Sequence, residues 1–260
     1  MRLAQLQMDA KAGAVEANLA RIELGAAEAA ARGAELMLTP ELAVQGYGAG
    51  EAMATLAEPL DGPQVRRLQE TAARNRIALV IGFAEKAGDR LYNAALLVRP
   101  DSRVSCYRKY HLYGDYEKGL FAPGEALPAV FEVAGMKVGL LICYDVEFPE
   151  AVRHLALAGA QLIAVPTALP ASDRDDFIAE RIVPVRAFEN QVFVAYTNFC
   201  GRDSLYAYAG RSCIAGPDGR DLARAAPKGE ALLLAGLDPD AYEEARLVNP
   251  YFADRRLGFG

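Results

Sequence analysis

Cys143 is the residue whose sequence context best suits chemistry. It ends the apolar stretch 137–143, which is typical of a short buried strand, and a helix is expected to open near Pro149. A thiol at such a bend can face a cleft, where the N-terminus of the helix favours its thiolate form. Free cysteines are also among the residues most often buried for structural reasons. Position alone therefore leaves Cys143 open as either a nucleophile or a core thiol.

Three further ionisable residues could assist a thiol nucleophile. The chain has only two histidines, and His154 lies in a predicted amphipathic helix, so the base is expected to be another residue type. Glu41 follows one predicted strand, Lys109 ends another, and Glu117 lies in a long irregular segment. Open sheets bind ligands beyond the carboxyl ends of their strands, which is where such residues would lie. Each of the three also has an ordinary explanation as a solvated charge.

The elements that must position these residues alternate between strands and helices. Strands are expected at residues 2–8, 35–39, 77–85, 91–99, 103–109, 137–143, 161–166, 192–198, 211–215 and 231–237. Helices are expected at residues 15–29, 63–75, from 149 onward and at 177–190, and an irregular loop at 110–128. Sheets inside and helices outside would bury both faces of each sheet, which indicates a layered α/β fold. We expect one domain, 1–238, with 239–260 as its C-terminal extension.

The composition excludes several classes of function. The net charge of −6, with lysines and arginines scattered along the chain, argues against a nucleic-acid partner. No apolar run approaches the roughly 18 residues of a membrane span, and no signal-peptide core follows Met1, so a cytoplasmic protein is expected. Four cysteines without CxxC spacing indicate reduced thiols, and two histidines make a zinc cage improbable. We expect no metal and no cofactor.

Short motifs surround the four ionisable residues and continue to residue 219. In chain order they are Pro40-Glu41 with Gly46-Tyr47, Tyr107-Arg-Lys109-Tyr-His111-Leu112, Phe121-x-Pro123-Gly124, Gly139-Leu-Leu-Ile-Cys143-Tyr-Asp145-x-Glu147-Phe-Pro149-Glu150, Val165-Pro166-Thr167, Arg186-Ala187-x-Glu189-Asn190 and Gly216-Pro-x-Gly219. In content and order these motifs resemble the nitrilase (carbon–nitrogen hydrolase) superfamily over nearly the whole chain. Because separated motifs agree, the resemblance is far more specific than any one of them.

The resemblance implies a four-layer αββα sandwich and a catalytic set of Glu41, Lys109 and Cys143, with Glu117 as the supporting glutamate eight positions beyond the lysine. In this mechanism Glu41 takes the thiol proton as Cys143 attacks an amide carbon. The Lys109 ammonium and the Tyr144 backbone N–H would stabilise the oxyanion, and water would release the acid from a thioester. His111 is expected to be a structural hydrogen-bonding residue. The reaction converts a small amide and water into a carboxylic acid and ammonia.

Residues after the nucleophile narrow the substrate. Family members that hydrolyse nitriles typically have Trp-Glu where this chain has Tyr144-Asp145, so the chain resembles the amidase branches, in particular 5-aminopentanamidases and R-stereoselective amidases. Relatives acting on carboxylate-bearing substrates have arginine three or four positions after the cysteine, whereas this chain has Glu147. A carboxylate there would favour a substrate amine. The alternative is that Glu147 caps the adjacent helix. N-carbamoyl amides and nitriles remain alternative substrates.

Other candidate pocket residues and partners follow from the same comparison. Tyr47, Thr167 and Ala168 are expected to line the substrate pocket together with Tyr144. The acidic residues Asp173, Asp175 and Asp176 could bind an ammonium group, or could simply be solvated at a helix start. The family commonly forms homodimers or larger homo-oligomers through the nucleophile turn and the C-terminal tail. Two readily distinguished alternatives are a non-catalytic ligand-binding or scaffold protein with this fold and a redox-sensing thiol protein.

Overall fold

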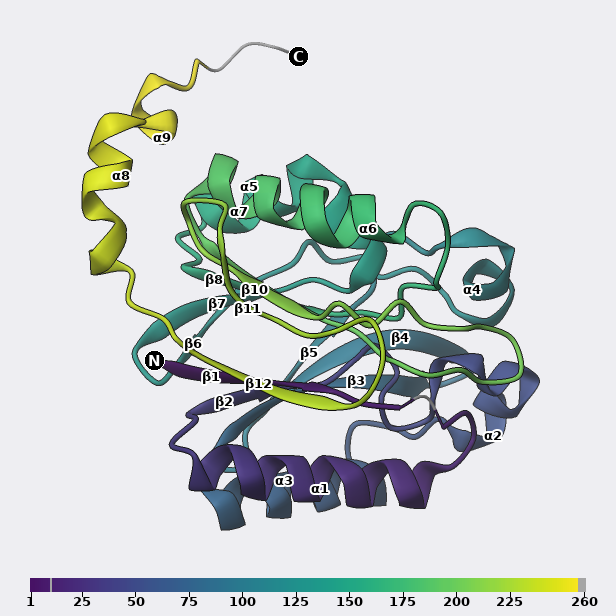
Figure 1. The fold of residues 1–260 in the computed structure, drawn as a ribbon. Helices are drawn as coiled ribbons and strands as arrows, with labels where there is room; N and C mark the ends of the chain where they lie inside the picture. The colour runs from purple at the N-terminus through teal and green to yellow at the C-terminus, as the bar shows by residue number, and fades with distance from the viewer. Residues whose placement is uncertain (10, 257–260) are drawn as a thin grey trace.

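Two six-stranded β-sheets, stacked face to face, lie at the centre of the computed structural model, which describes residues 1–9 and 11–256 (Figure 1). The first has the order β12-β1-β2-β3-β4-β5, with β1 Arg2–Gln7, β2 Leu36–Leu38, β3 Ala78–Ala87, β4 Arg90–Val98, β5 Val104–Arg108 and β12 Ala231–Gly236. The second has the order β11-β10-β9-β8-β7-β6, with β6 Val130–Val133, β7 Met136–Leu140, β8 Leu162–Pro166, β9 Phe193–Thr197, β10 Cys213–Ala215 and β11 Asp221–Arg224. β1, β2 and β3 run parallel, as do β7, β8 and β9, and the other neighbours are antiparallel.

Helices cover the outer face of each sheet. α1 (Val15–Ala31) and α3 (Pro63–Asn75) cover the first sheet, whereas α5 (Pro149–Leu157) and α7 (Val183–Asn190) cover the second (Figure 1). The shorter helices are α2 (Met53–Leu56), α4 (Gly114–Leu120), α6 (Asp175–Phe177), α8 (Glu243–Val248) and α9 (Tyr251–Asp254). The layer order is αββα, so the predicted four-layer sandwich is confirmed. Within the described residues, no helix is both long and apolar enough to cross a membrane.

The core is divided by the first sheet into two apolar clusters. Leu36 and Leu38 of β2 pack with residues of the second sheet, such as Leu140 of β7, whereas Met37 packs in the cluster of α1 and α3 with Leu19. This alternation is the period of two that a strand imposes on its side chains. Burying each such side chain stabilises the fold by about 1.5–3 kcal/mol, which fixes the register of β2 and the position of the residues that follow it.

Several elements differ from the sequence prediction. The predicted loop 110–128 contains α4, a single short helix between glycine and proline signals that a periodicity argument does not detect. β6 and β11 were not predicted, because each is a four-residue strand at a sheet edge and lacks a continuous apolar pattern. β7 ends at Leu140, three residues before Cys143. The helix predicted at 177–190 begins at Asp175 and includes a π-helical turn at Ile178–Ile182.

The described part of the C-terminal segment, 239–256, contains α8 and α9 and lies to one side of the second sheet and its helices (Figure 1). The Gln191 side-chain amide donates a 2.9 Å hydrogen bond to the Asn249 carbonyl oxygen, and the rings of Phe188 and Tyr251 lie 5.8 Å apart. Residues 257–260 of the predicted extension lie outside the described residues. The assignment of 239–260 to the same domain stays a prediction.

Candidate active site

The ionisable residues singled out from the sequence come together where carboxyl ends of strands from both sheets meet. Lys109 directly follows β5, Glu41 lies three positions after β2, and Cys143 lies three positions after β7. The two sheets are joined here by a 3.2 Å hydrogen bond from the Glu41 N–H to the Thr167 carbonyl oxygen, just beyond β8. One sheet therefore supplies the charged groups and the other supplies the thiol.

Two glycines allow neighbouring segments to approach these strand ends. A Cβ atom on Gly82 of β3 would lie 2.1 Å from the Pro40 carbonyl oxygen, and one on Gly124 would lie 2.3 Å from the Arg108 carbonyl oxygen. No other residue type fits at either position without moving backbone. The Gly124 N–H also donates a 2.8 Å hydrogen bond to the Lys109 carbonyl oxygen, which fixes the chain where β5 ends.

Lys109 lies between two carboxylates. Its Nζ donates hydrogen bonds to Oε1 of Glu41 (2.6 Å) and to Oε1 of Glu117 (2.7 Å), and all three side chains are at most 1% exposed. Burial by itself lowers the pKa of Lys109, but the two carboxylates outweigh it and hold that pKa above its ordinary value. A buried ammonium without such partners would be strongly destabilising. The site therefore contains a permanent positive charge.

Glu41 has one occupied oxygen and one free oxygen. Oε1 accepts hydrogen bonds from Lys109 and from Nδ2 of Asn93 (2.7 Å), whereas the buried Oε2 has no hydrogen-bond partner among the described residues. Burial raises the pKa of Glu41, the charge of Lys109 opposes this and the charge of Glu117 adds to it, so that the resulting pKa is about 7. A carboxyl group that titrates near neutral pH and has an unoccupied oxygen is suited to general acid–base chemistry.

Glu117 has both oxygens occupied. Oε1 accepts the bond from Lys109 and a 2.8 Å hydrogen bond from the Tyr47 hydroxyl, and Oε2 accepts a 2.9 Å hydrogen bond from the Tyr113 backbone N–H. Tyr113 immediately precedes α4, so this short helix holds its own glutamate by the N-terminus. The arrangement is suited to holding Lys109 in place rather than to exchanging protons.

Cys143 occupies a sharp turn. Its φ of 45° lies in the left-handed region, which costs a residue other than glycine about 1–3 kcal/mol, and it opens a 3-10 helix that ends at Glu147. Burial holds the pKa of the Cys143 thiol well above its ordinary value; Glu41 raises it further, whereas Lys109 and a backbone hydrogen bond from Ala168 oppose this. The thiol is therefore protonated at neutral pH and requires a base to become a nucleophile.

Asp145 holds the strained turn in place. One of its oxygens, Oδ2, accepts hydrogen bonds from the Ile142 N–H (3.1 Å) and the Tyr107 hydroxyl (2.8 Å). The other accepts the His111 N–H (2.9 Å) and contacts the His111 Nδ1 at 2.8 Å. His111 thus has the structural hydrogen-bonding position that the sequence suggested. These contacts explain physically why Tyr107 and His111 flank Lys109 in one motif while Asp145 follows Cys143 in another.

A cavity of about 490 Å³ opens at the thiol. Its lining includes the predicted residues Tyr47, Cys143, Tyr144, Glu147 and Ala168. Thr167 takes a different position from the one expected, because it is fully buried and its hydroxyl donates a 3.1 Å hydrogen bond to the Val165 carbonyl oxygen. Thr167 thus supports the segment below the pocket, and its carbonyl anchors Glu41, whereas the pocket wall is formed by its neighbour Ala168.

The backbone and the side chain of Glu147 make different contacts. Its carbonyl oxygen accepts a 2.8 Å hydrogen bond from the Arg186 guanidinium, which ties the nucleophile turn to α7. Its side chain lines the cavity, and no residue in the described part of the chain forms an ion pair with it. Burial raises the pKa of the Glu147 carboxyl, with Lys109 and Arg186 opposing the effect. The cavity therefore contains a carboxyl group that feels the charges of Lys109 and Arg186 but has no direct ion-pair partner among the described residues.

The acidic cluster near α6 is divided in the structure. Asp173 lies at the exposed rim of the cavity beside Arg174, so the two charges offset each other. Asp175 instead accepts a hydrogen bond from the Ser172 N–H (3.3 Å), and Asp176 accepts one from the Phe177 N–H (2.8 Å). Both lie in the first turn of α6, the position that was the alternative to ammonium binding, although the Asp175 side chain is largely buried and lies 3.8 Å from the Arg211 guanidinium.

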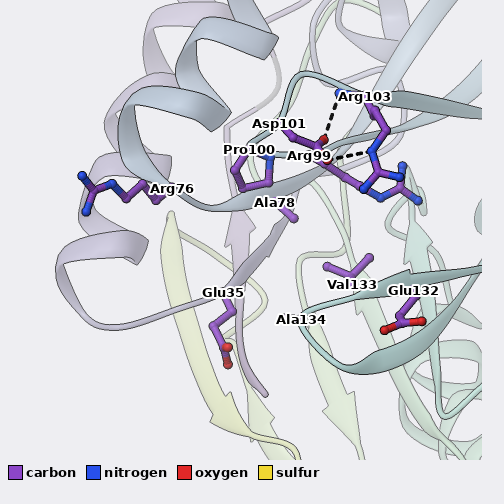
Figure 2. A pocket seen from close by; sticks show the side chains of 10 residues that line it. All are labelled: Glu35, Arg76, Ala78, Arg99, Pro100, Asp101, Arg103, Glu132, Val133 and Ala134. Atoms are coloured by element: carbon purple, nitrogen blue, oxygen red, sulfur yellow. Dashed lines mark hydrogen bonds and ion pairs between the residues drawn. The ribbon is translucent and has the colours of Figure 1, made fainter.

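A second cavity, of about 690 Å³, lies at the opposite end of the same strands (Figure 2). Its lining includes Glu35, which precedes β2, and Arg103, which precedes β5, whereas Glu41 and Lys109 follow these strands. In Figure 2, Asp101 neutralises Arg103 through a 2.7 Å contact. This hollow contains mixed surface charges and is separated from the thiol by the length of the sheets.

Comparison with known proteins identifies the class of molecule that this fold and site define. The family model described as carbon-nitrogen hydrolase matches residues 2–247. A hydrolase of Pseudomonas protegens is 42% identical over 98% of this chain and 89% of its own length. An (R)-stereoselective amidase of a Pseudomonas species is 35% identical over 99% of this chain and 92% of its own length. The amidase from Nesterenkonia sp. superposes with a TM-score of 0.88 at 36% identity, covering 98% of this chain and 93% of that chain.

The chain belongs to the carbon-nitrogen hydrolase family, the nitrilase superfamily that its motifs resemble. It is an enzyme of the amidase type, which hydrolyses amide carbon–nitrogen bonds. In one structure of a glutamate-to-glutamine mutant of the Nesterenkonia amidase, the acetamide moiety of fluoroacetamide is attached covalently at the active-site cysteine of that protein. The predictions of family, fold and enzyme class are confirmed.

Two contributors to the site were not singled out for a role from the sequence. Asn93 bonds Glu41, and its only signal is a polar residue within the apolar strand β4. Asp145 was noted only as part of a motif, although it organises the nucleophile turn. The bond from Asn93 to Glu41 and the bond from Tyr107 to Asp145 each join residues more than thirty positions apart, so they become visible only in the folded chain.

Proposed function

We propose that this protein hydrolyses a small aliphatic amide whose far end carries a protonated amine, such as 5-aminopentanamide. The observation that carries the proposal is the Glu147 carboxyl group, which lines the same cavity as Cys143 and has no cation partner among the described residues. A substrate ammonium would supply the missing charge and a charge-assisted hydrogen bond. The exposed pair Asp173 and Arg174 at the rim adds no net charge of its own.

The first half of the proposed reaction forms a thioester. Oε2 of Glu41 accepts the thiol proton while the Cys143 sulfur attacks the amide carbon, and the carbonyl electron pair moves onto oxygen. The Lys109 ammonium and the Tyr144 backbone N–H stabilise this oxyanion. Tyr144 is the second residue of a 3-10 helix, where the N–H has no acceptor within the helix. Glu41 then passes its proton to the nitrogen as the carbon–nitrogen bond breaks, and ammonia leaves.

The second half hydrolyses the thioester. Glu41, again ionised, takes a proton from water as the water oxygen attacks the thioester carbon. When the carbon–sulfur bond breaks, the sulfur recovers a proton from Glu41 and the carboxylic acid is released. Glu117 holds Lys109 throughout, and Tyr47 holds Glu117, because the oxyanion must form within hydrogen-bond distance of the ammonium. Glu41 therefore transfers protons and Glu117 holds the lysine to which both are bonded.

The similar proteins support the proposed reaction more directly than they support the proposed substrate. A mutant of the solved amidase has the acetamide moiety of fluoroacetamide added covalently at its active-site cysteine, and an (R)-stereoselective amidase is among the similar proteins. N-carbamoyl amides and nitriles are the alternative substrates within the superfamily. A protein with this fold that binds amides without turnover is the alternative of another class, and the buried cluster of Glu41, Lys109, Glu117 and Cys143 argues against it.

The substrate proposal is tested by comparing three amides of equal length. Ammonia release is measured with 5-aminopentanamide, pentanamide and the amide that carries a terminal carboxylate. We expect the amine to give the highest kcat/KM in the wild-type protein, and Glu147→Arg to reverse the preference between amine and carboxylate. Glu147→Gln is the matched control, since it removes the charge without reversing it. Equal kcat/KM for the amine and the uncharged amide in wild-type protein contradicts the substrate proposal.

The catalytic proposal is tested by Cys143→Ala, which should abolish ammonia release from every amide in the panel. Full activity in this variant would refute the thioester mechanism. A wild-type protein that binds amides but releases no ammonia across a panel that includes N-carbamoyl amides and nitriles would instead support the non-catalytic alternative.

We also propose a cytoplasmic homo-oligomer with no nucleic-acid partner. The support is the acidic net charge of −6 with scattered lysines and arginines, the cysteine pattern typical of reduced thiols, and the resemblance to a family that commonly assembles into dimers or larger forms. Sedimentation measured across a range of protein concentrations tests the assembly.

A further inference from the structure

Asn93 is a buried amide placed beside the proposed base. It is 1% exposed, and it lies near the start of β4, between β3 and β5. Its Nδ2 donates a 2.7 Å hydrogen bond to Oε1 of Glu41, and its carbonyl oxygen accepts a 2.8 Å hydrogen bond from the Lys109 N–H. One residue is therefore bonded to both members of the central ion pair, through its side chain and through its backbone.

Only the N–H group of the Asn93 side-chain amide forms a hydrogen bond. Oδ1 of Asn93 is buried and has no hydrogen-bond partner among the described residues. Leaving a buried amide oxygen unpaired is unfavourable, and an apolar residue would avoid that loss in a strand that is otherwise apolar at its centre. The N–H group directed at Glu41 is thus the contact that distinguishes Asn93 from an apolar residue at this position.

The two oxygens of Glu41 are consequently inequivalent. Oε1 accepts hydrogen bonds from Lys109 and Asn93, whereas Oε2 has no donor in the described part of the chain. A proton placed on Oε1 would face two donor groups, while a proton placed on Oε2 would face none. In the ionised carboxylate a half-turn exchanges equivalent oxygens and changes nothing, but in the protonated acid it would turn the O–H towards the donors, and the terminal torsion of a glutamate is broad enough to allow it. Asn93 adds a second donor to that side and so raises the cost of the reversed orientation beyond what Lys109 alone imposes.

We infer that Asn93 is a positioning residue that locks the Glu41 carboxyl group, so that Oε2 alone carries the proton between the thiol and the substrate nitrogen. This inference rests on the proposed function, in which Glu41 is the base. Oε2 of Glu41 is then the atom that transfers the proton. Asn93 determines that it is this oxygen, although Asn93 itself contacts neither the substrate nor the nucleophile.

Replacing Asn93 by leucine tests the inference, because leucine keeps the branched shape and the number of side-chain heavy atoms and removes the donor. Losing a hydrogen bond to the ionised form of Glu41 should move the acidic limb of the kcat/KM profile upward by about one pH unit, and should lower kcat about tenfold with little change in KM. Asn190→Leu is the matched control, since Asn190 is also a fully buried amide with an unpaired Oδ1, and its Nδ2 donates to the Arg186 carbonyl oxygen (2.9 Å) and to Oε1 of Glu189 (3.5 Å) rather than to Glu41. The control should leave the limb in place. An unchanged limb in Asn93→Leu overturns the inference.

A measurement on the wild-type protein keeps the inference testable even if Asn93→Leu does not fold. Below pH 7 the protonated Glu41 carboxyl gives an infrared C=O stretching band, identified by its absence in Glu41→Gln. If the proton lies on Oε2, the C=O oxygen is Oε1, which accepts two hydrogen bonds, and the band should appear at the low frequency of a strongly hydrogen-bonded acid. A band at the frequency of an unbonded acid overturns the inference. Full activity in Glu41→Gln would instead refute the proposed function itself.

Discussion

Glu41 and Glu117 bond the same lysine from two sides, and their surroundings differ. Glu41 has one oxygen free of donors, and burial raises its pKa to about 7. Glu117 receives donors on both oxygens, from Lys109 and Tyr47 on one and from the Tyr113 backbone on the other. Two residues of one type, within hydrogen-bond distance of one ammonium, are therefore suited to different tasks. What separates a proton carrier from a positioning group here is the count of donors on each oxygen.

The largest expected effect comes from neutralising the proton carrier. Glu41→Gln keeps the shape and removes the base, so kcat should fall by roughly 10³-fold or more, as measured by ammonia release. Glu85→Gln is the matched control, because Glu85 is a buried carboxylate of the same sheet that is paired with Arg108 rather than with Lys109. It should keep activity within a few-fold of the wild type. Similar losses in the two variants would mean that general disruption of the sheet explains the effect.

Neutralising the positioning group should cost less and change a different property. In Glu117→Gln the lysine loses one partner, and misplacement of the ammonium should lower kcat by roughly 100-fold. Because the charge of Glu117 raises the pKa of Glu41, its removal should also move the acidic limb of kcat/KM to lower pH. A loss as large as that of Glu41→Gln, with no shift of the limb, would remove the distinction between the two carboxylates.

The pH dependence of the wild-type enzyme provides the next test. The base acts in its ionised form, and the pKa of Glu41 is raised to about 7, so kcat/KM should rise as the pH increases through 7 and fall about tenfold per unit below it. The thiol pKa is raised and the protonated thiol is the resting form, so activity should not require pH values high enough to ionise it. A limb near the ordinary carboxyl pKa of about 4.3 would contradict the assignment.

The smallest effect is expected from Tyr47→Phe. It removes one donor from Glu117 and keeps the ring in the pocket wall, so kcat should fall roughly three- to tenfold. Tyr208→Phe removes a hydroxyl from the same group of aromatic rings, but that hydroxyl donates to Asp203. Activity assays of the two variants side by side separate the Glu117 bond from ring packing. Equal kcat values in the two variants would deny Tyr47 a specific role.

Helices and strands with strong local sequence signals, such as a helix-starting proline or regular apolar periodicity, were predicted better than those without them. Helix α3 was predicted with both of its bounds, because Pro63 suits the first helical turn and apolar periodicity continues to the C-terminus. The four-residue edge strands β6 and β11 lack such signals and form only because a neighbouring strand is present. Short helix α4 was assigned to a loop for the same reason, although it contains Glu117.

The candidate site could be predicted by resemblance, and only partly by residue pattern. Strand ends placed Glu41 and Lys109 at the correct edge of a sheet, but each charge retained an ordinary explanation until the motifs were compared. The hydrogen bond between Asn93 and Glu41 spans 52 positions in sequence, and its existence depends on how β2, β3 and β4 are aligned. The side-chain direction of Glu147 likewise follows from the 3-10 turn, which periodicity does not reveal.

Because the site is divided between the two sheets, the reactivity of the thiol indicates whether the two sheets of the chain have docked. Glu41, Lys109 and Glu117 are held by one sheet and Cys143 by the other, and the first sheet is completed by pairing β1 with β12 from the far end of the chain. A folding intermediate with undocked sheets would have an ordinary, solvated thiol and no hydrolytic activity. Amide hydrolysis is therefore expected only from chains in which the two sheets have docked.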